Sequence, residues 1–170
     1  MPHPRGTGNV PPPGNEGPWT AAMETAMETA MEEAAMAFDM QEVPIGAVLL
    51  DRQGSLVART HNQSIALHDP TAHAEILALR QGGKLLGNYR LSGTTLVVTL
   101  EPCLMCLGAM VHARIARLVF GATDPKSGAV ISRLRGTELP WLNHRIEVVG
   151  GVMEQECGEL LREFFRKKRR

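Results

Sequence analysis

Two short motifs, H-x-E at residues 73–75 and P-C-x-x-C at residues 102–106, are the features that most constrain how this 170-residue chain can fold. One histidine and two cysteines are ligand types that zinc prefers, and a catalytic zinc keeps one of its four positions open for water. The motifs are separated in the sequence, so they serve one site only if the fold brings them together. We therefore interpret the rest of the chain as a scaffold that joins His73, Cys103 and Cys106.

Hydrophobic patterning predicts alternating helices and strands along the chain. The expected elements are a helix at 20–40, strands at 43–50 and 56–60 around a turn at 51–54, a helix from 69 to a stop at Gly82-Gly83, a strand at 94–100, a helix opened by Pro102, strands at 117–121 and 145–149, and a helix from 154. This order predicts an α/β fold, a three-layer α/β/α sandwich around a mixed five-stranded sheet. Sites in such folds lie where strands end and the next helices begin, which is where both motifs lie.

Helical spacing of apolar residues identifies the faces that should pack in the core. The expected core positions are Met23, Met27 and Met31 in the first helix, Ile76, Leu77 and Leu79 in the second, Met105, Leu107, Met110 and Val111 in the third, and Cys157, Leu160, Leu161, Phe164 and Phe165 in the last. Cys157 is therefore expected to be a core residue and not a metal ligand.

Composition divides the chain into two parts. Residues 1–18 are rich in Pro and Gly and are expected to be a disordered extension, whereas residues 19–170 are expected to form one domain with a basic end. The net charge is zero, but residues 1–42 carry seven acids against Arg5 alone, so the remainder carries +6. Six basic residues lie within 162–170, either as a solvated, frayed end or as an arm that contacts phosphates.

Cysteine usage and hydropathy indicate the compartment. Three cysteines, two of them in C-x-x-C, fit a reducing compartment better than a disulfide framework, so we expect a cytoplasmic protein. No apolar run approaches the roughly 18 residues of a membrane span, and the N-terminal sequence lacks the pattern of a secretory signal. The sequence therefore predicts no membrane partner.

The spacing within each motif indicates its chemistry. Cys103 and Cys106 are three apart in the first turns of a helix, where free N–H groups favour thiolates. His73 and Glu75 are only two apart, so they converge only if a metal lies near the helix end. In that geometry Glu75 is better suited to move protons than to bind the metal. A closed structural site is the alternative, with His61, His68, His112 or His144 as the fourth ligand, but such a site does not need Glu75.

The combined motifs resemble those of the zinc-dependent cytidine deaminase superfamily. Within it, the chain is similar to the bacterial tRNA adenosine deaminases over about residues 20–168. The similar runs are 69–76, 80–83, 88–91, 99–103, 119–122, 126–128, 143–145 and 164–166. The resemblance implies one zinc ion per subunit, deamination of adenosine to inosine at the wobble position (34) of an arginine tRNA anticodon, attack by zinc hydroxide, and a homodimer.

The resemblance also assigns roles to individual residues. It implies that His73, Cys103 and Cys106 hold zinc and that Glu75 is the proton shuttle. Substrate-binding roles fall to the amide of Asn62, which bonds the flipped base; to the backbone N–H of Ala74, a candidate to hold the zinc-bound oxygen; and to Asp124, Lys126 and Arg166 along the RNA path. From the residues alone, Asn62 is also interpretable as a turn cap, and Lys126 and Arg166 as solvated surface. Pro125 and the run 139–141 depart mildly from the family pattern.

Two other classes of function remain open at this point. A deaminase of a free base or nucleotide, of the cytosine, guanine or dCMP type, needs neither the basic tail nor the Phe164-Phe165-Arg166 ending. A zinc-stabilised interaction module would bind the metal tightly without turnover. An anticodon loop suits the deaminase chemistry because its bases are already unpaired, so extruding one costs little.

Overall fold

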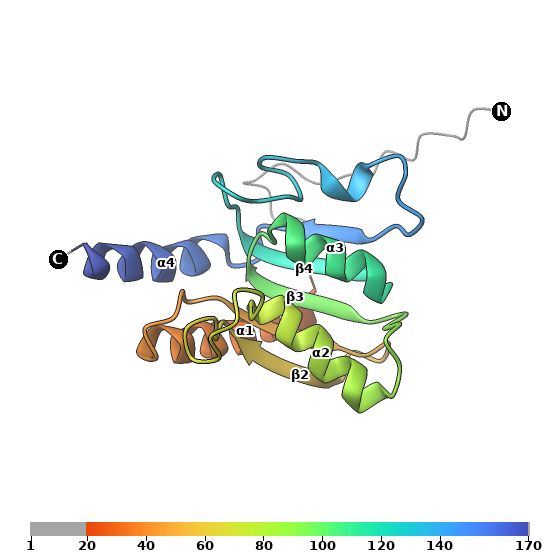
Figure 1. Cartoon of the computed structure of the whole chain (residues 1–170), viewed down its shortest axis with the longest axis horizontal. Helices are drawn as coiled ribbons and strands as arrows, with labels where there is room; N and C mark the ends of the chain where they lie inside the picture. The colour runs from red at the N-terminus through yellow and green to blue at the C-terminus, as the bar shows by residue number, and fades with distance from the viewer. Residues whose placement is uncertain (1–19, 170) are drawn as a thin grey trace.

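A computed structural model describes residues 20–169, which form one mixed sheet with helices on both faces (Figure 1). The elements are α1 (Ala21–Asp39), β1 (Gly46–Leu50), β2 (Leu56–His61), α2 (Ala74–Leu86), β3 (Thr95–Leu100), α3 (Leu104–Ala113), β4 (Arg117–Ala122), the short 3-10 helix η1 (Gly136–Glu138), β5 (Glu147–Gly150) and α4 (Glu154–Lys168). The sheet order is β2-β1-β3-β4-β5. The predicted three-layer α/β/α sandwich with a mixed five-stranded sheet is confirmed.

The sheet changes direction in its middle. β1 pairs antiparallel with both β2 and β3, whereas β3, β4 and β5 run parallel to one another. Parallel strands need a crossover, and α3 supplies it between β3 and β4. Helices α2 and α3 cover one face, in front in Figure 1, and α1 and α4 pack on the other.

Each face of the sheet buries its own apolar cluster because alternate residues of a strand point to opposite faces. The larger cluster lies under α2 and α3 and includes Ala47, Leu49, Leu96, Val98, Leu118 and Phe120. The smaller one lies under α1 and α4 and includes Val48, Val97 and Val119. The three central strands are thus covered on both sides, as their apolar runs predict.

Several predicted boundaries are wrong, among them the start of α2, which is Ala74 and not residue 69. β1 begins at Gly46 instead of residue 43. Helix α2 does not stop at Gly82-Gly83: it continues to Leu86 and ends at Gly87, which has the left-handed φ of 65°. Gly82 is a packing position, because a Cβ there would lie 2.3 Å from the Leu49 side chain. Pro102 precedes the cap of α3 and is not in its first turn, since Cys103 is the N-cap.

The predicted core faces are mostly confirmed. Met27 is fully buried in α1, and Met23 and Met31 pack beside it. Cys157 is buried, as expected of a core residue. Phe165 and Met105 are the exceptions, because each is exposed at the edge of a groove.

Two predictions depend on which residues the structure describes. The expected disorder of residues 1–18 lies outside the described residues. Within residues 20–169, none of the helices combines the length and the apolar character that crossing a membrane requires.

Candidate functional site

The two motifs meet where α2 and α3 begin. His73 is the N-cap residue of α2 and Cys103 is the N-cap residue of α3, and both have extended backbone. The Nδ1 atom of His73 lies 3.7 Å from Sγ of Cys103 and 3.6 Å from Sγ of Cys106. The ligand atoms of all three residues lie within 4.8 Å of one another. The fold therefore joins the predicted metal ligands.

This donor set fits zinc. With ordinary Zn–N and Zn–S bond lengths, two ligand atoms of a tetrahedral site lie about 3.6 Å apart, which matches the two observed N···S distances. No fourth protein ligand completes the group within the described part of the chain. The Nδ1 of His61 binds Glu33 instead, and His144 contacts the carbonyl of Ile115. The arrangement is that of an open site and not of a closed structural one.

The ligand side chains influence one another's protonation. The hydrogen bond between the thiols lowers the pKa of Cys103 to about 4, and the same contact raises that of Cys106. The pKa of His73 lies above its ordinary value, chiefly because of its hydrogen bond with Cys103. A thiolate at the start of α3 is also favoured by the free N–H groups of the helix end.

Glu75 lies beside the ligands in the first turn of α2. Its side chain is buried, with 3% of the residue exposed, and its Oε2 has no hydrogen-bond partner within the described part of the chain. Burial raises the pKa of Glu75 to about 7, and the negative charge of Cys103 adds to the effect. Burying a carboxylate oxygen without a hydrogen-bond partner costs stability, so its presence indicates a functional role for Glu75. A carboxyl group with a pKa near 7 is suited to proton transfer at neutral pH.

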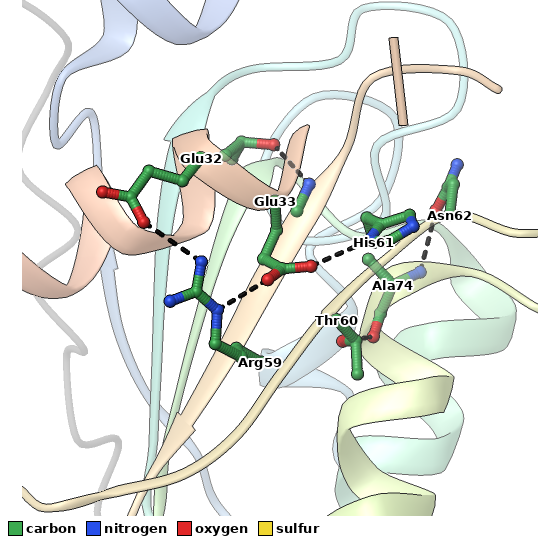
Figure 2. A network of polar contacts seen from close by, with 9 residues as sticks. Glu32, Glu33, Arg59, Thr60, His61, Asn62 and Ala74 are labelled. Carbon is green, nitrogen blue, oxygen red and sulfur yellow. Dashed lines mark hydrogen bonds and ion pairs between the residues drawn. The ribbon is translucent and has the colours of Figure 1, made fainter. Parts of the chain in front are cut away.

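The backbone of Ala74, between His73 and Glu75, is bonded by Thr60 of β2 and by Asn62, directly after β2 (Figure 2). Its N–H donates to Oδ1 of Asn62 at 2.8 Å, and its C=O accepts from the hydroxyl of Thr60 at 2.7 Å. Asn62 therefore bonds another element and is not a local turn cap. The prediction that the Ala74 N–H holds a zinc-bound oxygen is wrong in this structure, because that N–H is already donated to Asn62. Thr60 was not predicted from the sequence, and its strand pattern gives no signal that its hydroxyl is used.

His73, Cys103 and Glu75 line a cleft of about 1120 Å³, and Cys106 is buried behind them. Its lining includes four of the five predicted substrate residues, which are Asn62, Asp124, Lys126 and Arg166 of α4. Helix α4 adds a basic wall made of Arg162, Lys168 and Arg169 together with Phe165. The fold thus gathers the predicted residues around one opening, which explains why Phe165 is exposed and not in the core.

Glu101, directly after β3, organises the part of the cleft wall that is formed by the loop after β4. Its carboxylate accepts the N–H groups of Asp124, Val130, Ile131 and Ser132 at 2.8–3.1 Å, and also the hydroxyl of Ser132. Burial alone would raise the pKa of Glu101, but these hydrogen bonds outweigh it and hold the pKa below its usual value.

Sequence analysis missed this role of Glu101. The available signal was a charged residue ending an apolar strand directly before Pro102. Such a residue is buried with the strand and needs partners.

Comparison with known proteins agrees with the geometry. A family model described as the cytidine and deoxycytidylate deaminase zinc-binding region matches residues 20–122. The tRNA-specific adenosine deaminase of Haemophilus influenzae is 52% identical over 128 residues, which cover 75% of this chain and 74% of that protein.

Solved structures show the same similarity. One from a study of A-to-I editing by tRNA:A34 deaminases superposes with a TM-score of 0.78 at 47% identity and covers 81% of this chain and 99% of that one. A guanine deaminase from Nitrosomonas europaea superposes with a TM-score of 0.71 at 28% identity and covers 83% of each chain. With the family motifs in place at one cleft, the chain belongs to the tRNA-specific adenosine deaminase family, within the cytidine and deoxycytidylate deaminases.

Proposed function

We propose that this protein is a zinc-dependent hydrolase that converts adenosine to inosine at the wobble position (34) of the anticodon of tRNA(Arg). The observation that carries the proposal is the buried, unpartnered Oε2 of Glu75 beside an open His-Cys-Cys set in a cleft with a basic wall. The tRNA-specific relatives support the substrate class, and the resemblance of the motifs supports the arginine tRNA.

The chemistry follows from the residues at the bottom of the cleft. His73, Cys103 and Cys106 would hold zinc, which lowers the pKa of a bound water to about 7 in favourable sites. Glu75 accepts a proton from the attacking water at its free Oε2 and passes it to the amino group; the oxygen of the water stays bonded to the ring carbon, and the C–N bond breaks to release ammonia. The amide of Asn62 uses Oδ1 for Ala74, which leaves its NH2 group to donate to a ring nitrogen of the base.

The walls of the cleft suit an RNA loop. Arg162, Arg166, Lys168 and Arg169 of α4 and Lys126 on the opposite wall supply positive charge for phosphates. Phe165 is 45% exposed beside them and offers a surface on which an unpaired base can stack. Asp124 stabilises the loop after β4, because its carboxylate accepts the N–H groups of Lys126 and Ser127.

We further propose a homodimer in the cytoplasm. An apolar groove lies between α2 and α3, and Tyr89 and Met105, which line it, are exposed. A patch of this kind usually marks an interaction surface. Free thiols as metal ligands suit a reducing compartment.

Nucleoside analysis of an arginine anticodon stem-loop tests the substrate. The zinc-loaded protein is incubated with the stem-loop carrying adenosine at the wobble position, with the same stem-loop carrying guanosine there, and with free adenosine, cytidine and guanine. We expect inosine in the first RNA alone. The structural similarity to a guanine deaminase makes turnover of a free base the main competing outcome, and that result with untouched RNA would overturn the proposal. Bound zinc without any turnover would instead favour an interaction module.

A further inference from the structure

Glu33 of α1 is a buried carboxylate that the reaction does not use directly. The residue is 5% exposed, and its two oxygens accept from Nε of Arg59 at 2.6 Å and contact Nδ1 of His61 at 2.7 Å (Figure 2). Burial raises the pKa of Glu33, but the hydrogen bonds with His61 and Arg59 outweigh it and keep the pKa below its ordinary value. Glu32 next to it is exposed and bonds the same guanidinium at 3.0 Å.

The partners of Glu33 lie on a strand that needs support. β2 is an edge strand of the sheet, and its pairing with β1 ends at His61 opposite Gly46. Beyond that pair, two backbone bonds continue along the described chain, from the N–H of Asn62 to the carbonyl of Ile45 and from the N–H of Gln63 to the carbonyl of Ala72. Because an edge strand has a partner strand on one side only, the side chains that contact its end help to fix its position.

Strand alternation connects Glu33 to the site on the other face of the sheet. Arg59 and His61 point toward α1, whereas Thr60 and Asn62 point toward α2 and bond the Ala74 backbone (Figure 2). A movement of this part of β2 therefore moves the peptide that separates a metal ligand from the proton shuttle.

We propose that Glu33 is a positioning residue for the deamination: it fixes the end of β2 through Arg59 and His61, and Thr60 and Asn62 then fix Ala74 between His73 and Glu75. The inference rests on the proposed function. A misplacement of about 1 Å at a catalytic group lowers a rate about 100-fold, so loosening this clamp should lower kcat by about 10-fold or more.

The test compares Glu33→Gln with Glu32→Gln. Glutamine keeps the shape of Glu33 but has no charge and only one acceptor oxygen, so it cannot accept from both Arg59 and the Nδ1–H of His61 through separate oxygens as Glu33 does. Glu32→Gln is the matched control, because it removes a carboxylate from the same helix and from the same arginine. We expect E33Q to lose kcat on the stem-loop about 10-fold or more with KM within about twofold and zinc content unchanged, while E32Q matches the wild type.

Hydrogen exchange at the Ala74 amide supplies a readout besides activity. Its protection should fall in E33Q and not in E32Q, because its acceptor is the Asn62 side chain. If the wild type forms no inosine, the proposed function fails, whereas the exchange measurement still decides whether Glu33 holds the clamp.

Thr60 gives a second, independent variant. Thr60→Val removes the hydroxyl bonded to Ala74 and should lower kcat, whereas Thr60→Ser keeps it and should restore kcat. In the double variant with E33Q, the two losses should be less than multiplicative, because both act through Ala74. The proposal would be overturned if E33Q had the kcat and the exchange protection of the wild type. It would also be overturned if, in both E33Q and T60V, kcat fell only in proportion to lost zinc or to unfolded protein.

Discussion

Glu101→Gln is expected to destabilise the protein because it removes the charge on which the wall of the cleft is assembled. One carboxylate oxygen accepts three backbone N–H groups, from Val130, Ile131 and Ser132. The other accepts the N–H of Asp124 and the hydroxyl of Ser132. A glutamine of the same shape has only one oxygen, so the least costly orientation keeps the three-donor side and turns its NH2 group toward Asp124.

The size of the effect follows from these contacts. Hydrogen bonds to a charged acceptor contribute about 1.5–3 kcal/mol and neutral ones about 0.5–1.5 kcal/mol, so each of the three retained bonds weakens by about 1 kcal/mol. The N–H of Asp124 loses its acceptor at a cost of about 1–3 kcal/mol. The hydroxyl of Ser132 can rotate to accept from the new NH2 group. We therefore expect the free energy of unfolding to fall by about 5 kcal/mol.

Urea unfolding at neutral pH measures this loss. Glu147→Gln is a suitable control, because Glu147 is an exposed residue whose ion pair with Arg117 lies on the surface, and it should change stability by less than about 1 kcal/mol. A loss of less than about 1 kcal/mol in E101Q, with an unchanged m-value, would refute the reasoning that the carboxylate charge holds this wall.

Three further predictions concern the scaffold. Gly46→Ala should cost about 3 kcal/mol in urea unfolding, at the upper end of overpacking effects, because its Cβ would lie 1.9 Å from the carbonyl of Ala30; a cost under about 1 kcal/mol would contradict that close packing. Cys157→Ala should cost about 1–2 kcal/mol but leave zinc content unchanged, and lost zinc would contradict its core role. Wild type should be more stable than Glu33→Gln by a constant amount above about pH 4.3, the pKa of an unfolded glutamate, and this difference should shrink as the pH falls through the lower pKa of Glu33 in the folded protein. A difference that stays constant below that folded pKa would contradict the role of the Glu33 charge.

The sequence was sufficient for the sheet and for the meeting of His73, Cys103 and Cys106 at one point of the fold. Apolar runs predicted each strand, and their order predicted a mixed sheet whose helix beginnings bring His73 and Cys103 together. The prediction worked because strand burial and helix capping depend on local residue types. The predicted helix end at Gly82-Gly83 was wrong, because the sequence does not distinguish a glycine that permits close packing, as Gly82 does, from a glycine that ends a helix.

The contacts that hold the site residues in place could not be predicted from the sequence. Glu33 pairs with His61 across 28 residues, and the bond from Thr60 to Ala74 spans 14. Neither pair forms a local pattern, because the contacts arise only once α1 and α2 pack on opposite faces of the sheet. Phe165 shows the same limit: helical spacing places it on the apolar face of α4, but the packing of α4 leaves it at the mouth of the cleft.

The most direct measurement of the central claim is the zinc content and the inosine yield of the same preparations of wild type and Glu75→Ala. The stem-loop with adenosine at the wobble position is the substrate. We predict one zinc per chain in both proteins and inosine from the wild type alone, because Glu75 moves protons and does not bind the metal. Inosine formation by Glu75→Ala, or loss of its zinc, would contradict the account.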